Sequence, residues 1–446
     1  MSETSSGPRG PMQARPADGL SGRLAAPGDK SVSHRAFIFG ALARGETRIS
    51  GLLESEDVLN TGKAMAALGA KVERTGPGAW QVTGCAGQFS TPAVALDFGN
   101  AGTGVRLVMG VVAGAGVGAD FIGDASLSSR PMRRVTDPLG AMGAQFETTD
   151  GRLPAHLEPS RLHGIDYTPP VASAQVKSAI LLAGLGAQGE TRVHEPQITR
   201  DHTETMLKAF GAEIDVARDG PASTIRLTGP QILTACPVDV PGDPSSSAFA
   251  LVAALIIPDS EVTLTGVMDN PARTGLFTTL QEMGADLTIT PGPEMAGEKT
   301  MTITARTSTL KGIEVPAERA PAMIDEYPIL SVAAAFAEGT TFMPGLEELR
   351  AKESDRLAGT AALLAASGVQ VEAGEDSLTV HGAGLKGVEG GGQTATHHDH
   401  RLAMSGLVLG LASRAGASVD DVAMIATSYP DFFDHMRTLG AVLEPV

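Results

Sequence analysis

The residues best suited to chemistry open a polar stretch near the start of the chain. Residues 28–35 read GDKSVSHR, and the apolar run that follows to Leu42 predicts a buried helix. A helix start presents unpaired N–H groups and partial positive charge, and both favour an anion. Ser31 and Arg35 would share one helical face. The stretch therefore predicts a phosphate or carboxylate site, with a capped, solvated helix start as the alternative.

Five further polar stretches introduce apolar helices in the same way. Ser and Asp are ordinary N-caps, so each stretch alone can be purely structural. Their recurrence indicates instead that several helix N-termini serve one anion-attracting site. These helices are expected to begin near Gly102, Ser173, Ser245, Asp325 and His400.

Charged stretches precede three other helices. They occupy residues 128–134, 199–202 and 350–357. The last of them contains Lys352, Glu353 and Arg356 at helical spacing. A solvated helix face held by ion pairs is the alternative to a functional role there.

A unit of buried helix, strand, amphipathic helix and strand recurs six times. Each amphipathic helix ends at a Gly, which takes the left-handed conformation at low cost, and the alternating pattern that follows predicts a strand. Three units precede Pro241 and three follow it, which predicts two similar α/β domains with a ligand cleft between them. The glycines are Gly69, Gly143, Gly211, Gly284, Gly368 and Gly440, 68 to 84 residues apart.

Composition limits the function classes. The 446 residues carry a net charge of −17, which argues against general binding to nucleic acid or anionic membranes. An anionic substrate would need a local basic cluster. Cys85 and Cys236 have no CxxC partner and predict free thiols in a reducing cytosol. No apolar run reaches membrane-spanning length. Residues 1–20 are expected to form a disordered tail.

A metal site is not expected. Residues 397–400 read HHDH, but adjacent helical residues do not face one another, and Arg401 would repel a cation.

Taken together, five motifs resemble the 5-enolpyruvylshikimate-3-phosphate (EPSP) synthase family, the 3-phosphoshikimate 1-carboxyvinyltransferases. The resemblance runs from about Ser21 to Val446. Residues 199–203 and 325–329 are most similar to the bacterial class that includes glyphosate-tolerant enzymes. The motifs are GDKSVSHR (28–35), GNAGTGVR (99–106), SAQ (173–175), RAKESDR (350–356) and DHR (399–401).

The resemblance implies a fold of two inverse α/β barrel domains with three repeats each. The first domain would span 28–241, and the second would combine 21–27 with 242–446. The crossovers would lie near Pro27 and Pro241. Such enzymes close around their substrates and are usually monomeric, and a cytoplasmic location is expected.

The resemblance also implies site residues. Arg suits both substrates because its planar fork binds carboxylate and phosphate bidentately. Shikimate-3-phosphate would be bound by Lys30, Ser31, Arg35, Ser173, Gln175, Arg200, Asp325 and Lys352. Phosphoenolpyruvate would be bound by Lys30, the Gly102 backbone, Arg130, Gln175, Arg356 and Arg401.

The implied reaction is addition followed by elimination, with no metal or organic cofactor. The shikimate hydroxyl attacks C2 of phosphoenolpyruvate while C3 gains a proton, and loss of that proton and of phosphate leaves the enol ether. Asp325 matches the family's base and Glu353 its proton carrier, with Lys30 assisting. Carboxylates near so many cations should have lowered pKa values, so a proton-donating Glu353 would need shielding.

Two departures from the family pattern stand out. Residues 426–429 contain no Lys where many relatives have one, and Ala174 replaces a Ser. Gly102 predicts greater glyphosate sensitivity than an Ala at that position, which would narrow the phosphoenolpyruvate pocket.

Two rival interpretations remain. The sister transfer to UDP-N-acetylglucosamine uses a reactive Cys, and residues 123–131 contain none. A non-catalytic protein that binds phosphorylated metabolites would keep the cations but would not need Asp325 and Glu353.

Overall fold

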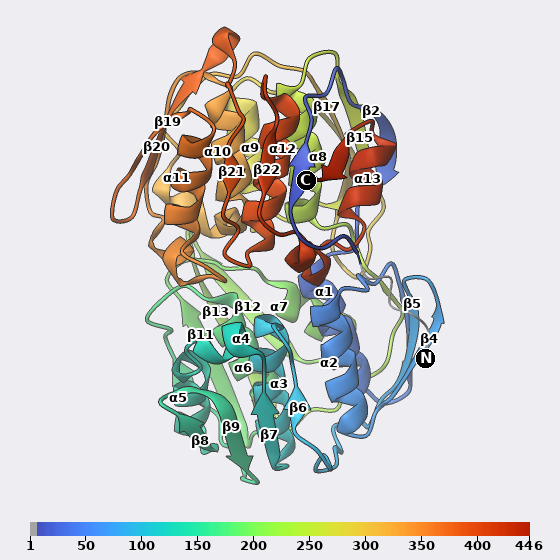
Figure 1. The fold of residues 1–446 in the computed structure, drawn as a ribbon. Coiled ribbons are helices and arrows are strands. Elements are labelled where there is room, and N and C mark those ends of the chain that lie inside the picture. Colours follow the sequence, from blue (N-terminus) through green and yellow to red (C-terminus); the bar gives the residue numbers. More distant parts are fainter. Residues whose placement is uncertain (1–6) are drawn as a thin grey trace. The chain divides into compact units, whose positions relative to one another are not determined.

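The computed structural model describes residues 7–446. The chain divides into two compact units, coloured along the sequence in Figure 1. The first unit comprises residues 28–241 together with 294–298. The second comprises the residues up to Pro27, 242–293 and 299–446. The chain therefore passes between the units after Pro27, after Pro241 and on both sides of residues 294–298.

The first unit is built from three helix-and-sheet repeats. Its innermost helices are α1 (Lys30–Leu42), α3 (Gly102–Ala115) and α6 (Ala174–Gly184), and each is almost wholly buried. Its other helices are α2 (Glu56–Ala67), α4 (Ala125–Ser129), α5 (Arg133–Ala141) and α7 (His202–Ala209).

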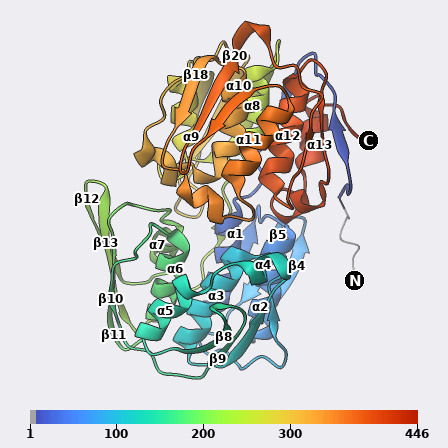
Figure 2. The ribbon, with the colours of Figure 1, turned by 60° about the vertical axis from the view of Figure 1, so that its left-hand side comes forward.

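Three four-stranded sheets surround these helices (Figures 1 and 2). The first sheet has the order β14 (Val238–Asp239), β3 (Glu46–Ser50), β5 (Ala79–Thr83), β4 (Lys71–Gly76). The second is β6 (Leu96–Asp97), β7 (Ala119–Ile122), β9 (Arg152–Glu158), β8 (Gln145–Thr149). The third is β10 (Asp166–Tyr167), β11 (Gly189–Glu195), β13 (Ala222–Gly229), β12 (Ile214–Asp219).

The second unit repeats this plan. Its innermost helices are α8 (Pro244–Ile256), α10 (Tyr327–Ala335) and α12 (His400–Ala412). Its other α-helices are α9 (Gly275–Glu282), α11 (Arg356–Ala366) and α13 (Phe432–Thr438). Short 3₁₀ helices include η2 (Ile324–Glu326) and η3 (Glu347–Ala351).

The sheets of the second unit show the same strand pattern. The first is β16 (Asp286–Pro291), β17 (Thr300–Arg306), β15 (Glu261–Met268), β2 (Ser21–Ala25). The second is β18 (Glu338–Met343), β20 (Leu378–Ala383), β19 (Gln370–Ala373). The third is β21 (Gln393–Thr394), β22 (Ala417–Val419), β1 (Met12–Ala14), β23 (Leu443–Pro445).

Local chemistry explains where the helices begin and end. Four of the inner helices carry a side-chain N-cap, in which the cap oxygen accepts a backbone N–H of the first turn. The six repeat glycines that follow the amphipathic helices all have φ between 81° and 112°, which only Gly adopts cheaply. The predicted helix starts and stops are confirmed. The N-caps are Asp29, Ser173, Asp243 and Asp399.

The predicted strand after each amphipathic helix is also present, but a second strand was missed. In most repeats that strand turns back into an antiparallel partner, as β4 does into β5 and β12 into β13. These partners give each repeat a hairpin that closes the sheet. Burial alternates along β13 and β17, so a period-2 signal for these strands was present in the sequence.

The prediction of a disordered tail over residues 1–20 is wrong for the part that the structure describes. Strand β1 pairs antiparallel with both β22 and β23, and Met12 and Ala14 are buried. The reason is topological. The sixth repeat ends with β23 near the last residue, so the strand lying between β22 and β23 comes from the beginning of the chain. Residues 1–6 lie outside the described part.

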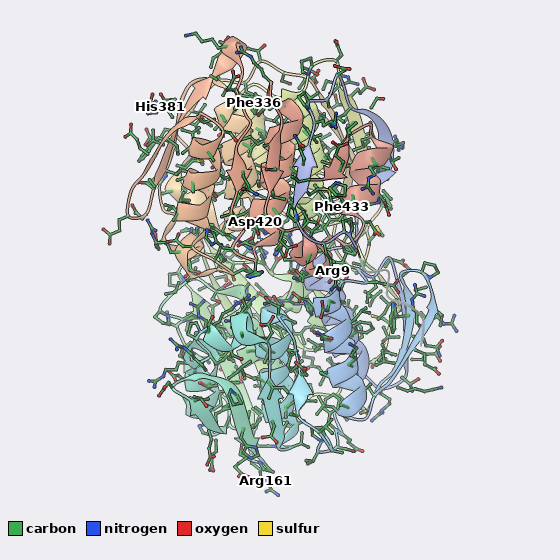
Figure 3. All side chains as sticks on the ribbon, viewed as in Figure 1. Arg9, Arg161, Phe336, His381, Asp420 and Phe433 are labelled. Carbon is green, nitrogen blue, oxygen red and sulfur yellow. The ribbon has the colours of Figure 1, made fainter. Side chains whose placement is uncertain are left out.

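Apolar packing fills the interior of each unit. In the second unit, rings from α8, α13 and the segment before α13 pack edge to face, and Phe433 of this group is labelled in Figure 3. Within residues 7–446, no helix is both long and apolar enough to span a membrane.

Candidate active site

Lys30 lies in the first turn of α1, in the first unit. Its Nζ is 2.5 Å from Oδ2 of Asp57, a residue of the first turn of α2. One turn along α1, Nδ1 of His34 lies 2.8 Å from the Thr61 hydroxyl. His34 is fully buried, and this burial, reinforced by Lys30 and Arg35, holds its pKa well below the usual value. A neutral His34 therefore stands among the cations of this helix start.

Arg35 joins the starts of three helices. Its Nε donates to the Thr203 hydroxyl of α7 at 2.8 Å, and its Nη2 donates to the Ser178 hydroxyl of α6 at 2.8 Å. Its Nη1 donates to the backbone carbonyl of Ser31 at 2.9 Å. The guanidinium is only 2% exposed. These three hydrogen bonds orient the guanidinium.

A second group surrounds Gly102 at the start of α3. Arg106 donates to Oε1 of Gln175 on α6 at 2.8 Å, and Gln175 donates to the Thr103 hydroxyl at 3.0 Å. A Cβ added at Gly102 would lie 3.0 Å from Nη1 of Arg130 and 3.2 Å from Nη1 of Arg106. The backbone of Gly102 therefore faces two guanidinium groups.

Arg130 is oriented by an amide and a hydroxyl oxygen. Its Nη2 donates to Oδ1 of Asn100 at 2.5 Å and to the Ser126 hydroxyl at 3.2 Å. Asn100 is held in turn by Asp124 at 2.8 Å. Gly102, Arg130 and Gln175, all predicted for phosphoenolpyruvate, are thus brought together in one unit.

The remaining predicted residues of this unit are on neighbouring elements. Ser173 caps α6 by accepting the Val176 N–H at 3.4 Å. Arg200 lies in the segment between β11 and α7, directly before Asp201, the N-cap of α7.

The second unit contains a different arrangement, centred on Arg356 at the start of α11. Its side chain is 1% exposed and contacts three carboxylates. The distances are 2.9 Å from Nη1 to Oδ1 of Asp325, 2.5 Å from Nη2 to Oε2 of Glu353, and 2.7 Å from Nε to Oδ2 of Asp399. The two predicted proton-transfer residues therefore share one buried cation.

Electrostatics in this cluster favours the ionised forms. Burial by itself works against the charge on Arg356, but Asp399, Glu353 and Asp325 outweigh it and raise the pKa of the guanidinium. Burial likewise raises the pKa of Asp399, yet the nearby Arg356 more than offsets this, and the net pKa is lowered.

Asp399 links this cluster to α12. Its Oδ1 caps the backbone N–H of Arg401 at 2.9 Å, while Oδ2 also accepts from the Ser354 hydroxyl at 3.1 Å. Nη1 of Arg401 lies 4.0 Å from Oε1 of the buried Glu326. The solvated-face interpretation of residues 350–357 is therefore wrong for Arg356, which is buried.

Two local expectations need correction. Asp325 lies in the 3₁₀ helix η2 rather than at the first turn of α10, which begins at Tyr327. Lys352 follows η3 and is not on a helix with Arg356; its Nζ is 3.9 Å from Oδ1 of Asp325. Pro328 stands in the first turn of α10, where its missing N–H and fixed φ are tolerated.

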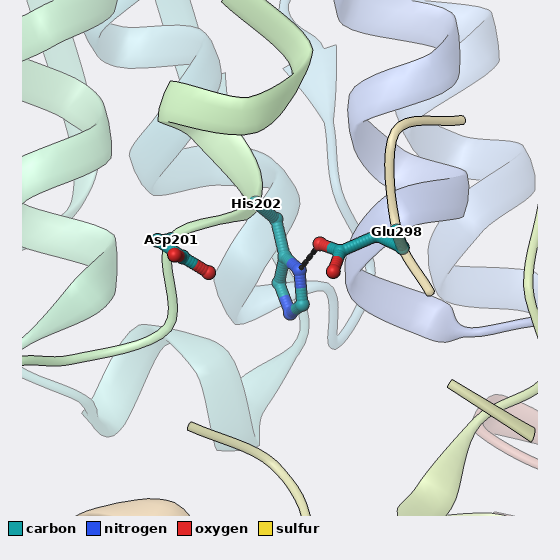
Figure 4. A group of neighbouring side chains, drawn as sticks. All are labelled: Asp201, His202 and Glu298. Carbon is teal, nitrogen blue, oxygen red and sulfur yellow. Dashed lines mark hydrogen bonds and ion pairs between the residues drawn. The ribbon is translucent and has the colours of Figure 1, made fainter. Parts of the chain in front are cut away.

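Among residues 7–446, Asp201, His202 and Glu298 have ligand atoms within 4.8 Å of one another, close enough for a metal ion (Figure 4). Nδ1 of His202 is 2.8 Å from Oε1 of Glu298. Nη2 of Arg218 is 2.8 Å from Oδ2 of Asp201. Hydrogen bonding and ion pairing therefore account for the group, and we assign it no metal.

Several residues that orient the site were missed from the sequence. Asp57 is the partner of Lys30, but it reads only as an acidic first turn of a helix. Arg106 and Asp399 stood inside the quoted motifs and were given no role. Their positions were a usable signal, because Arg106 lies four residues after Gly102 and Asp399 lies two residues before Arg401, and both of those residues had been assigned to the site.

The comparisons with known proteins follow this geometry. The family model described as EPSP synthase (3-phosphoshikimate 1-carboxyvinyltransferase) matches residues 14–436. A protein of Maricaulis maris named 3-phosphoshikimate 1-carboxyvinyltransferase is 72% identical, over 98% of each chain. One of the same name from Afipia carboxidovorans is 60% identical, over 97% of this chain and 98% of its own.

The chain belongs to the EPSP synthase family.

Solved structures agree with this assignment. The EPSP synthase of Acinetobacter baumannii superposes with a TM-score of 0.87 at 42% identity, covering 98% of this chain and 99% of that one. The enolpyruvyl transferase NikO of Streptomyces tendae has a TM-score of 0.75 at 20% identity, which supports the fold alone. The predicted α/β enolpyruvyl transferase fold is confirmed, and the EPSP synthase match decides against the UDP-N-acetylglucosamine alternative.

Proposed function

We propose that this chain transfers the enolpyruvyl group of phosphoenolpyruvate to the 5-hydroxyl of shikimate-3-phosphate and releases phosphate. The enzyme then serves the shikimate pathway to chorismate and the aromatic amino acids. Family membership over residues 14–436 supports the activity. The structural observation that carries the proposal is the attachment of Asp325 and Glu353 to the single buried guanidinium of Arg356.

The first unit supplies most of the binding groups in this proposal. Three hydrogen bonds orient the Arg35 guanidinium, and we assign it to the phosphate of shikimate-3-phosphate. The start of α3 at Gly102 attracts the anion of phosphoenolpyruvate, and the Gly102 N–H itself donates to the Asn100 carbonyl at 2.7 Å. We assign shikimate-3-phosphate to Lys30, Ser31, Arg35, Ser173, Gln175 and Arg200. We assign phosphoenolpyruvate to Lys30, Gly102, Arg130 and Gln175.

The second unit supplies the proton-transfer groups. Asp325 and Lys352 also contact shikimate-3-phosphate, and Arg356 and Arg401 also contact phosphoenolpyruvate. Arg356 fixes Asp325 and Glu353 at the same time, so the base and the proton carrier are oriented by one group.

The reaction proceeds in two stages. Asp325 takes the proton of the shikimate hydroxyl as its oxygen attacks C2, and Glu353, with Lys30, delivers a proton to C3. Glu353 then takes a proton back from C3 as phosphate leaves with the C2–O bonding pair, and the proton on Asp325 passes to the departing phosphate, which leaves the enol ether. Arg356 holds Glu353 in place through both stages.

The departures from the family pattern limit the phosphate contacts. Ala174 has no hydroxyl to offer, and residues 426–429 contain no lysine. The Thr427 hydroxyl donates to the Met424 carbonyl at 2.7 Å, so we assign this segment no substrate contact.

We further propose that glyphosate inhibits this enzyme at the phosphoenolpyruvate site and that Gly102 makes it sensitive. We also propose a monomer in the cytoplasm. The two free cysteines, Cys85 and Cys236, agree with a reducing compartment.

The test is phosphate release from phosphoenolpyruvate, measured with and without shikimate-3-phosphate. Release that requires both substrates supports the proposal, and no release with both present rejects it. Asp325→Ala and Glu353→Ala separate an enzyme from a binding protein. An enzyme loses turnover in both variants, whereas a protein that only binds phosphorylated metabolites never shows release.

A further inference from the structure

Three charged side chains are buried together behind the helix starts of the first unit. Nζ of Lys177, on α6, lies 3.0 Å from Oε2 of Glu195 and 2.7 Å from Oε1 of Glu204. Glu195 ends β11, and Glu204 lies in the first turn of α7. All three side chains are at most 5% exposed. We call Lys177, Glu195 and Glu204 the buried triad. Charges this deep persist only when they are paired, so the triad binds three elements together.

The triad also holds the segment between β11 and α7. Thr199 donates its backbone N–H to Oε1 of Glu195 at 3.3 Å, and its hydroxyl donates to the same oxygen. The carbonyl of Thr199 accepts from Lys177 at 3.4 Å. The Ser223 hydroxyl on β13 donates to Glu195 at 2.8 Å. Thr199 is thus fixed through three of its polar atoms, and Arg200 is the next residue.

A second layer of hydrogen bonds lies beside the triad. Ser178 and Thr203, the neighbours of Lys177 and Glu204 in sequence, have their hydroxyls 2.7 Å apart. Both hydroxyls accept from Arg35 of α1. The same two helix starts are therefore joined twice, once by the triad and once through Arg35.

We propose that the buried triad is a positioning device for shikimate-3-phosphate, holding Arg200 at a fixed place relative to Ser173 and Gln175. This inference rests on the proposed function. Lys177, Glu195 and Glu204 act through Thr199 and α6 and do not touch substrate.

The physical reason is preorganisation. Arg200 lies in a segment without helix or strand, and its long side chain loses conformational freedom when it binds an anion. If the backbone of this segment is already fixed, less conformational entropy is lost when the substrate binds. The affinity for the substrate is therefore higher. The triad should therefore affect shikimate-3-phosphate binding more than the proton-transfer steps of the second unit.

Thr199→Val and Thr199→Ser form the main test. Val keeps the size of Thr but loses the hydroxyl that Glu195 accepts, whereas Ser keeps the hydroxyl and loses a methyl group. Binding of shikimate-3-phosphate is measured by calorimetry without phosphoenolpyruvate, and phosphate release gives KM and kcat. Thr199→Val should weaken shikimate-3-phosphate about tenfold and leave kcat at saturation within about twofold, while Thr199→Ser stays near the parent.

Lys177→Met extends the test, with Leu157→Ala as the matched control. Lys177→Met leaves two buried carboxylates without their cation and should weaken shikimate-3-phosphate more than Thr199→Val does. Leu157 is buried on β9 of the same unit and takes no part in the triad. Its truncation should lower thermal stability without changing KM for shikimate-3-phosphate.

The outcomes separate this inference from the function it rests on. Equal affinities in Thr199→Val, Thr199→Ser and the parent would overturn the positioning role, as would an equal loss of affinity in Leu157→Ala. If Thr199→Ser loses affinity for shikimate-3-phosphate and Thr199→Val does not, the methyl group of Thr199 matters and its hydroxyl does not. That result would also overturn the positioning role. A parent protein that releases no phosphate with both substrates would reject the proposed function itself.

Discussion

The two units hold their arginines in opposite ways. In the first unit Arg35, Arg106 and Arg130 are oriented by hydroxyl, amide and carbonyl oxygens. In the second unit Arg356 is surrounded by three carboxylates, Asp325, Glu353 and Asp399. Arg35 and Arg106 lie near the starts of inner helices, whereas Arg356 begins the outer helix α11, so the two settings also differ in their place in the repeat.

The different partners of these arginines suggest different roles for the two units, substrate affinity in one and proton transfer in the other. Hydroxyl and amide partners orient the guanidinium groups of the first unit toward an anion, which a chain of net charge −17 must attract locally. Carboxylate partners cancel the charge but provide groups that accept and donate protons. The first unit should therefore dominate shikimate-3-phosphate binding, and the second should dominate turnover.

Arg356→Met should have the largest effect. It leaves Asp325, Glu353 and Asp399 without their shared cation, so the free energy of unfolding should fall by about 3–5 kcal/mol. Turnover should fall at least about a thousandfold, because both proton-transfer groups lose their orientation. Denaturant unfolding and phosphate release measure the two effects.

The double variant Arg356→Met/Asp399→Asn is the control for this prediction. Removing one carboxylate relieves part of the repulsion, so stability should partly return while turnover does not. Recovery of turnover in the double variant would show that Arg356 acts only through stability.

Arg35→Met should produce the next largest effect, on affinity. Losing one buried guanidinium that binds phosphate should weaken shikimate-3-phosphate about 30- to 100-fold, as seen by calorimetry. Arg74→Met is the matched control, since Arg74 is a cation of the same unit, paired with Glu54 at the surface. An equal loss in both variants would mean that only overall charge matters.

Gly102→Ala should change inhibitor selectivity. The added methyl group would meet Arg130 at 3.0 Å and Arg106 at 3.2 Å, which narrows the space before the helix start. The inhibition constant of glyphosate should rise about tenfold, with a smaller rise in KM for phosphoenolpyruvate. Identical inhibition constants for parent and variant would refute this role of Gly102.

The smallest expected effect is a pH dependence of the free energy of unfolding, caused by a residue of the first unit. Burial, with Lys30 and Arg35, holds the pKa of His34 well below its usual value. Below about pH 6.5 the unfolded chain takes up this proton first, and stability falls by up to about 1.4 kcal/mol per pH unit until the folded-state pKa is reached. The lowered pKa of Asp399 affects stability in a different pH range. The stabilisation that it gives is lost only as the pH falls below about 3.9.

Fluorescence of Trp80 can follow this effect, because Trp80 is the single Trp and packs on Phe37 of α1. Urea unfolding at pH 7.5 and 5.5 should show a smaller stability loss in His34→Asn than in the parent. His381→Asn, at an exposed site of the second unit, should match the parent. If His34→Asn loses as much as the parent, another group controls the acid sensitivity.

Sequence reasoning succeeded where the signals are local. Helix starts at Asp29 and Ser173, and stops at glycines such as Gly69, depend on residues a few positions apart. Strand β1 was missed because its pairing depends on partners far along the chain, whereas the second hairpin strands were missed despite having neighbouring partners, as β5 has in β4. Met12, for example, pairs with Val419.

For the candidate site, too, local signals were predicted and long-range contacts were missed. The motifs placed Arg356, Glu353 and Asp325 among the candidates, but they did not show that one buried guanidinium joins them or that Asp399 completes the group. The partnership of Lys177 with Glu195 and Glu204 also remained hidden, since burial decides it and burial arises from the folded unit.

Glu353→Gln tests the division between binding and chemistry most directly. Gln keeps an oxygen for Arg356 but cannot carry the proton. Titration of shikimate-3-phosphate into this variant should give the parent affinity within about threefold, while phosphate release falls about 10²- to 10⁴-fold. Affinity that falls together with turnover, or turnover that persists, would contradict the account.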